Sequence, residues 1–113
     1  MHAKDMGKVG EAIVIQQALE HGCAVFPEFG DNSKIDLIIE GSDKTLNRVQ
    51  VKTVNRVNGI SKLYFYKSGP DYAFAYSEKD VDWFAVVDNE TKSVAWVPAS
   101  AAKKSGSRYS SLS

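Results

Sequence analysis

The sequence predicts a single domain of the α/β class, more narrowly α+β, with a central mixed β-sheet flanked by helices. Three observations support this. An amphipathic pattern at the start of the chain predicts a helix over residues 6–22. Residues 46–54 alternate apolar and polar side chains, as a half-buried strand does. The apolar run at 83–87 is typical of a buried strand.

The elements follow in order along the chain. In the helix, Asp5 is the predicted N-cap and His21-Gly22 the predicted end. Its apolar positions approximate a period of 3.6 residues and are Val9, Ala12, Ile13 and Leu19. The first half of the chain then continues with an extended run at 23–26, a turn at 29–32, strands at 35–40 and 46–54, and a turn at 58–59. An aromatic strand at 62–67 and an ambiguous segment at 71–82 follow. The last elements are a buried strand at 82–88, a turn at 88–92, a return strand at 93–97 and a short helix at 98–104.

The 113 residues have the length of one domain. Residues 1–104 are expected to form it, and the serine-rich residues 105–113 are expected to be a flexible tail. No apolar run reaches the roughly 20 residues that a membrane helix needs. The start of the chain carries no secretory signal, and a single cysteine, Cys23, precludes an intrachain disulfide. These features predict an intracellular, cytoplasmic protein without a membrane partner.

The charges are balanced in number but not in position. Fourteen Lys and Arg residues offset fourteen Asp and Glu residues, and the zero sum argues against a uniformly basic nucleic-acid binder. Residues 44–67, however, contain six basic residues and no acidic one. Such a block suits DNA phosphates, although a solvated sheet surface would show the same pattern. The candidate DNA-binding residues are Lys8, Lys34, Arg48, Arg56, Lys62 and Lys67.

A group of chemically useful side chains is expected at the hairpin of the strands 35–40 and 46–53. If residues 41–45 form its loop, Asp36 lies opposite Gln50, and Lys52 shares their face. A carboxylate, a neutral oxygen and a lysine at one place are the parts of a metal-dependent phosphodiesterase. The backbone carbonyl of Val51 and the helix residue Glu11 are further candidate ligands. A cross-strand ion pair of Asp36 with Lys52 is the alternative explanation of this pattern.

Several short motifs, in this order and spacing, resemble the PD-(D/E)XK nuclease superfamily. They are GKVGE at 7–11, FGDN at 29–32, IDLII at 35–39 and RVQVKT at 48–53. The later strings DWFAVV at 82–87 and AWVP at 95–98 resemble its branch of small endonucleases similar to a cyanobacterial group I intron homing endonuclease. Holliday junction resolvases share the core pattern. The resemblance covers residues 7–99 and implies a restriction-endonuclease-like core.

The resemblance also implies roles for individual residues. Mg²⁺, for which Mn²⁺ can substitute, would be bound by Asp36, by Glu11 directly or through water, and by the Val51 carbonyl, with Gln50 assisting. Lys52 matches the catalytic lysine. Gln50 stands where most members carry Asp or Glu, which removes one negative charge and should weaken cation binding. Glutamine also occurs there in the intron-nuclease branch.

The predicted function is therefore a Mg²⁺-dependent DNA endonuclease that hydrolyses phosphodiester bonds. Its substrate would be duplex or branched DNA, cut in a structure-selective way as by a resolvase or site-specifically as by a homing enzyme. Cutting two strands needs two sites, and a chain this short holds one, so a homodimer or homotetramer is expected. The alternative is a catalytically inactive nucleic-acid-binding or assembly protein of the same fold.

Overall fold

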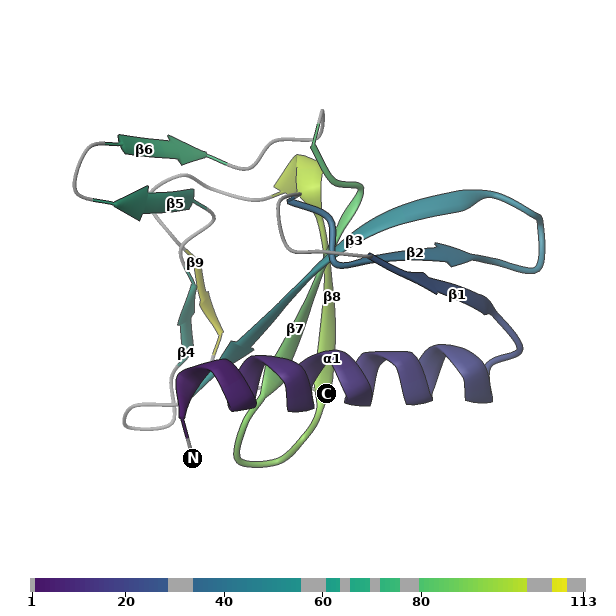
Figure 1. The fold of residues 1–113 in the computed structure, drawn as a ribbon, viewed down its shortest axis with the longest axis horizontal. Coiled ribbons are helices and arrows are strands. Elements are labelled where there is room, and N and C mark those ends of the chain that lie inside the picture. Colours follow the sequence, from purple (N-terminus) through teal and green to yellow (C-terminus); the bar gives the residue numbers. More distant parts are fainter. Residues whose placement is uncertain are drawn as a thin grey trace.

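The computed structural model describes residues 2–28, 34–55, 61–63, 66–69, 72–75, 80–101 and 107–109. Its centre is a five-stranded mixed sheet with the strand order β1-β2-β3-β7-β8, against which one long helix packs (Figure 1). These elements are α1 (Ala3–Glu20), β1 (Ala24–Pro27), β2 (Leu37–Glu40), β3 (Leu46–Val54), β7 (Trp83–Asp88) and β8 (Val94–Pro98). The α+β class is therefore confirmed.

Smaller elements complete the described part of the chain. Two short two-stranded sheets lie at the end of the molecule away from the hairpin that joins β2 to β3 (Figure 1). They pair β4 (Ser61–Leu63) with β9 (Ser107–Tyr109), and β5 (Tyr66–Gly69) with β6 (Tyr72–Ala75). A single 3₁₀ turn, η1 (Ala99–Ala101), follows β8 where the sequence predicts a short helix. None of the described helices is long and apolar enough to cross a membrane.

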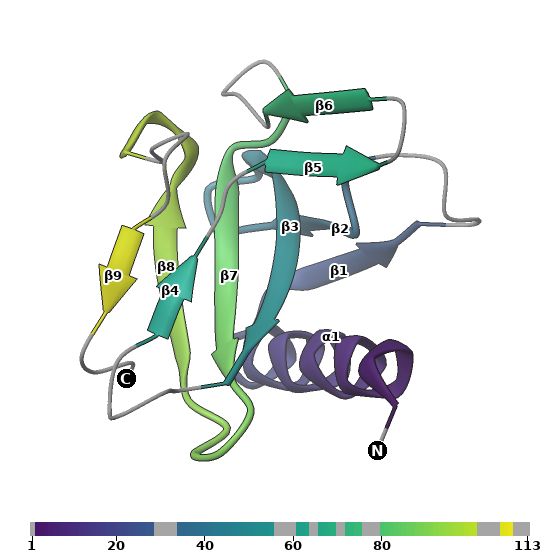
Figure 2. The same cartoon turned by 90° about the vertical axis from the view of Figure 1, so that its left-hand side faces the viewer.

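The strand β3 carries the predicted site and lies at the centre of the sheet. It pairs antiparallel with β2 and parallel with β7, and the other neighbours in the sheet are antiparallel (Figure 2). The hairpin register agrees with the prediction, because Glu40 lies opposite Leu46 and Leu37 opposite Val49. The loop between the strands turns at Lys44, whose φ is 67°.

The helix begins earlier than predicted. Its N-cap is His2, without a side-chain capping bond among the described residues, so Asp5 lies in the first turn and the prediction of Asp5 as N-cap was wrong. A carboxylate in that turn still interacts favourably with the helix dipole. The predicted end is confirmed, since His21 is the C-cap and Gly22 takes a positive φ of 78°.

The buried stripe of α1 consists of small residues. Gly10, Val14 and Ala18 are buried, while Ala12 and Leu19, two of the predicted apolar positions, are exposed. A Cβ atom at Gly10 would collide with the hydroxyl of Thr53 on β3. The hydroxyl of Thr53 also donates a 3.4 Å hydrogen bond to the carbonyl of Met6. The missing side chain at Gly10 therefore lets the first half of α1 approach the site strand closely.

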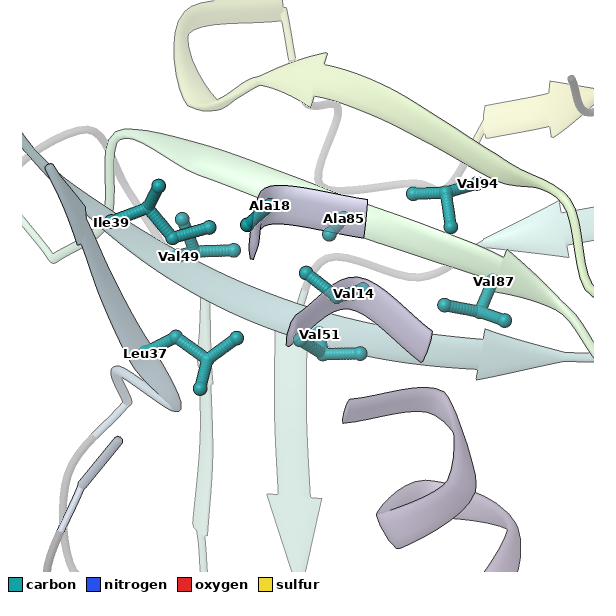
Figure 3. Close-up of a cluster of buried hydrophobic side chains, with 9 residues drawn as sticks. All are labelled: Val14, Ala18, Leu37, Ile39, Val49, Val51, Ala85, Val87 and Val94. Carbon is teal, nitrogen blue, oxygen red and sulfur yellow. The ribbon is translucent and has the colours of Figure 1, made fainter. Parts of the chain in front are cut away.

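Two hydrophobic clusters occupy the two faces of the sheet. The cluster under α1 includes Val14 and Ala18 from the helix together with Val49 and Val51 from β3 (Figure 3). The second cluster, on the other face, is built around Phe84. Alternate residues of β7 belong to the two clusters, which confirms that this strand is buried on both faces.

Some regions differ from the sequence-based prediction, and others lie outside the described residues. The aromatic strand predicted at 62–67 is divided between β4 and β5, which belong to different sheets. The ambiguous segment 71–82 contains the strand β6. Residues 107–109 of the expected flexible tail form β9, paired with β4. The turns predicted at 29–32 and 58–59 lie outside the described residues.

Candidate functional site

Asp36 directly precedes β2, at the end of that strand away from the hairpin loop, and it departs from the regular register. Its backbone N–H donates a 2.9 Å hydrogen bond to the carbonyl of Val49, although the register partner of Val49 is Leu37. Two consecutive residues therefore face one, as in a β-bulge, a device that often redirects a side chain near an active site. Asp36 is thus not directly opposite Gln50 as predicted. Instead, its Oδ2 atom accepts a 2.8 Å hydrogen bond from the N–H of Val51.

The backbone of Val51 presents a second oxygen at the same edge of β3. In a strand, the N–H and C=O of one residue point to the same side. The N–H of Val51 points toward Asp36, whereas the carbonyls of Arg48 and Val54 accept bonds from Asp82 and Asn89 on the β7 side. The carbonyl of Val51 is therefore directed toward the edge where the Asp36 carboxylate lies.

Gln50 and Lys52 project from the face of β3 opposite α1, because Val49 and Val51 point into the cluster under the helix. Both side chains are half-buried. The Oε1 atom of Gln50 is buried and accepts no hydrogen bond from any residue that the structure describes. An unsatisfied buried amide oxygen is costly, and it is typical of a position that a ligand completes.

Glu11 comes to this site from the helix. It follows Gly10, where α1 lies close to Thr53 on β3, and its side chain is half-buried. Burial raises the pKa of the Glu11 carboxyl, and the negative charges of Asp36 and Glu28 raise it further, while Lys8 opposes the shift. The predicted residues Glu11 and Asp36 are thus neighbours in space.

Glu28 is a site neighbour that the sequence did not reveal. It directly follows β1, and its N–H donates a 3.0 Å hydrogen bond to the carbonyl of Asp36. The sequence-based strand ended before it, at Pro27, so its proximity was not expected. The signal that could have found it is the pairing of 24–27 with 37–40, since continuing that register by one residue places Glu28 opposite Asp36.

The oxygens gathered here fit a hard divalent cation. Asp36, the Val51 carbonyl and Gln50 Oε1 provide oxygen donors of the kind that Mg²⁺ prefers. Within the described ranges, no group of three or more His, Cys, Asp or Glu side chains is arranged to hold a metal ion. Mg²⁺ usually takes one or two carboxylates and keeps several waters, so it does not require three acidic ligands. The residues present therefore fit the cation that the resemblance implies.

Two of the predicted DNA-binding residues form ion pairs within the chain. Lys34 lies 3.2 Å from Asp80. Arg48 forms a two-pronged pair with Asp82, with Nε–Oδ2 and Nη2–Oδ1 distances of 3.1 and 3.0 Å. This hydrogen-bonded pair lowers the pKa of Asp82 and raises that of Arg48. Lys8 is exposed, whereas Arg56 and the side chains of Lys62 and Lys67 lie outside the described residues.

Comparison with known proteins identifies the family. The family model described as PD-(D/E)XK endonuclease matches residues 1–110, which is nearly the whole chain. The chain belongs to the PD-(D/E)XK endonuclease family. Both the suspected family and its restriction-endonuclease-like core are thereby confirmed.

A solved structure shares the fold. The chain is similar to a bacterial homing endonuclease, I-Ssp6803I, with a TM-score of 0.77 and 21% sequence identity over 88% of this chain and 70% of that chain. At this identity the likeness shows the shared fold. No curated protein matches the sequence.

Proposed function

We propose that this PD-(D/E)XK endonuclease is a Mg²⁺-dependent enzyme that hydrolyses phosphodiester bonds in DNA at the site of Glu11, Asp36, Gln50 and Lys52. The observation that carries the proposal is the hydrogen bond that holds the Asp36 carboxylate beside Val51 on β3, next to the predicted residues Gln50 and Lys52. Three oxygen donors are proposed as cation ligands. They are the Asp36 carboxylate, the Val51 carbonyl and the buried Oε1 of Gln50. A nuclease family implies a nucleic-acid substrate, and we place the activity inside the cell because its substrate is there.

Each residue has a proposed role. Asp36, Val51 and Gln50 hold the cation, and Glu11 holds it directly or through water. A bound divalent cation lowers the pKa of a water ligand and stabilises charge on the phosphate. Lys52 orients the attacking water or offsets charge that develops on the phosphoryl oxygens. The bulge at Asp36 fixes the carboxylate beside β3 before any cation binds.

The proposed assembly is a homodimer or a homotetramer, because one chain offers one site and double-strand cleavage requires two. Symmetric pairs of sites suit a two-fold duplex target as well as a four-way junction. The similar solved structure is a homing endonuclease, which favours a duplex site.

A cleavage assay tests the proposal. Supercoiled plasmid, linear duplex and a synthetic four-way junction are incubated with the full chain in Mg²⁺, Mn²⁺ or EDTA. We expect cleavage in either cation and none in EDTA. Asp36→Asn and Lys52→Ala should each reduce the rate by about 10²–10³-fold. Asp5→Asn and Lys44→Ala change the same residue types at exposed positions and should leave the rate unchanged.

Two outcomes would contradict the proposal. Cleavage that survives both Asp36→Asn and Lys52→Ala would show that the site lies elsewhere. DNA binding without metal, combined with no cleavage of any substrate, would favour the inactive binding protein. The residue that favours this alternative is Gln50, which brings no negative charge to the cation.

A further inference from the structure

The helix leaves one part of the central sheet uncovered. α1 packs against β1, β3 and β7, whereas β8, the last strand of the sheet, lies beyond β7 and away from α1 (Figure 2). Trp96 on β8 is paired with Ala85, which belongs to the cluster under α1, so its indole lies on the helix side of the sheet. The Trp96 side chain is 41% exposed. A large aromatic side chain therefore stands at the open rim of this face.

A hollow lies directly beside Trp96. Its volume is about 270 Å³, and it is lined by Ile39, Asn47, Val49, Trp83 and Trp96. Sites for drug-sized ligands have volumes of roughly 300–1,000 Å³. The hollow is therefore better matched to one large side chain than to a separate small molecule.

A second hollow, of about 180 Å³, continues this surface toward the end of α1. It shares Ile39 and Trp96 with the first and is also lined by Gln17 and His21. Together the two hollows form the tryptophan groove. The residues that line it include no Lys, Arg, Asp or Glu, although these residues make up 25% of the chain. The groove thus lacks the cations that DNA phosphates need, and it resembles the cores of protein interfaces, which are poor in charge and rich in aromatic residues.

The tryptophan groove carries a projecting side chain and a receiving hollow on the same surface. In a two-fold dimer the same patch meets itself, so each copy has to present both halves of the contact. Trp96 and the hollow beside it meet this requirement. Because the groove is uncharged, two copies would not bring like charges face to face.

We propose that the tryptophan groove is the contact surface between two copies of this chain, in which Trp96 of each copy enters the larger hollow of the other and packs on its Trp83. A tryptophan in a pocket at the centre of a contact is a frequent hot spot of binding. Gln50 and Lys52 project from the opposite face of the sheet, so the contact leaves them open to DNA. The inference rests on the proposed function, because the pair of chains supplies the two sites that double-strand cleavage requires.

Sedimentation equilibrium of the full chain over a series of concentrations measures the association. The parent chain should sediment at twice its mass of 12.4 kDa or at a higher multiple. Trp96→Lys should weaken the association by at least about 30-fold, the effect of losing a hot-spot side chain. The matched control is Phe26→Lys on β1, the other edge strand. Phe26 is 52% exposed on the face opposite α1, and its substitution should leave the mass unchanged.

A pair of charge variants separates a contact between copies from a defect in folding. Trp96→Lys and Trp96→Glu each bring like charges together across the two-fold axis, because Trp96 also lines the hollow that the second copy enters. Each variant should therefore be monomeric alone. Mixed in equal amounts, the two variants should associate, since the introduced lysine meets the introduced glutamate. Mixing would not repair a folding defect.

Three outcomes would overturn the inference. The first is a parent chain that stays monomeric at every concentration, as it would if another segment of the chain or a different protein covered the groove. The second is an oligomer that survives Trp96→Lys. The third is a failure of the Lys and Glu variants to associate when they are mixed.

Cleavage of supercoiled plasmid distinguishes a failure of this inference from a failure of the proposed function. The parent chain should linearise the plasmid, whereas Trp96→Lys, which keeps the proposed site intact, should nick one strand. A parent chain that cuts both strands as a monomer would overturn the inference alone. A parent chain that associates through Trp96 but cuts no DNA would overturn the proposed function alone.

Discussion

At the residue scale, Asp36 serves the sheet as well as the proposed site. Its carboxylate accepts the N–H of Val51, a bond that a backbone carbonyl would make in a regular ladder. Removing such an acceptor leaves a backbone donor unsatisfied, which costs about 1–3 kcal/mol. A variant of Asp36 can therefore lose activity because the proposed cation ligand is missing or because the sheet is destabilised. Substitution by Asn or by Ala distinguishes these two causes.

We expect Asp36→Ala to reduce the free energy of unfolding by about 1–3 kcal/mol, because the N–H of Val51 loses its partner. Asp36→Asn retains an acceptor oxygen and should cost clearly less. Both variants should lose cleavage. Urea denaturation without metal measures the difference, and equal stabilities of the two variants would contradict the role of this hydrogen bond.

Gly10 gives a second prediction at this scale. Gly10→Ala should destabilise the fold by roughly 1–3 kcal/mol, since the added Cβ collides with the Thr53 hydroxyl and pushes α1 from β3. Gly7→Ala is the matched control, because a Cβ there meets no atom within 4 Å and alanine favours the helix. The thermal unfolding temperature should fall for Gly10→Ala and rise for Gly7→Ala. A stabilising Gly10→Ala would contradict the close approach.

At the element scale, the parallel pair β3–β7 has no hairpin to set its register. The two-pronged pair of Arg48 with Asp82 joins the strands near their first residues. Backbone bonds strengthen the junction, since the N–H of Arg48 donates to Asp82 Oδ2 and the N–H of Asp82 donates to the Arg48 carbonyl. Arg48 therefore belongs to the structure of the sheet as well as to the basic block.

The pH dependence of stability tests this junction. The lowered pKa of Asp82 means that its pairing stabilises the fold above the ordinary carboxyl pKa of 3.8, and that this contribution is lost as pH falls through the lowered value. Asp82→Asn should therefore reduce the urea midpoint at neutral pH. The two chains should converge in acid below pH 3.8. Asp5→Asn is the control. A difference in urea midpoint between the parent chain and Asp82→Asn that persists unchanged in acid would contradict the stabilising role of the Arg48–Asp82 pair.

The sequence predicted the regular elements better than the irregular backbone between them and the pairing of distant strands. Alternation along 46–54 predicted β3, and the five-residue loop predicted the register of the hairpin. The bulge at Asp36 was not predictable, because it depends on tertiary packing rather than on local pattern. The proximity of Glu28 to Asp36 was not predicted, because no local sequence pattern indicates that β1 pairs with β2. The stripe of Gly10, Val14 and Ala18 was hidden because small residues carry little hydrophobic signal.

At the scale of the whole molecule, a net charge of zero coexists with a local separation of charge. The acids Asp36 and Glu28 lie close enough to Glu11 to raise its pKa, while the acid-free segment 44–67 runs from the hairpin loop through β3 to β5. Part of this basic surplus is neutralised within the chain by the pair of Arg48 and Asp82. Lys44 likewise lies 4.0 Å from Glu40.

We expect affinity for DNA to fall steeply with salt, as counterions return to the phosphates. Lys8→Gln should weaken binding and reduce the slope of log K against log salt by about 0.9, the value for one phosphate contact. Lys44→Gln removes the same charge at the hairpin loop and should change the slope less. Titrations in EDTA, which prevent cleavage, measure both slopes. A salt-insensitive interaction would contradict the proposed phosphate contacts.

The hydrogen bond from Val51 to Asp36 also gives the protein a built-in spectroscopic reporter. A cation that withdraws electron density from this carboxylate weakens its acceptance of the N–H, and the amide resonance of Val51 should respond directly. An amide that makes no hydrogen bond to a metal ligand changes its chemical shift only through indirect structural effects of the cation. Nuclear magnetic resonance of one backbone amide in the middle of β3 could therefore follow loading of the site, without substrate and without a label beyond ¹⁵N.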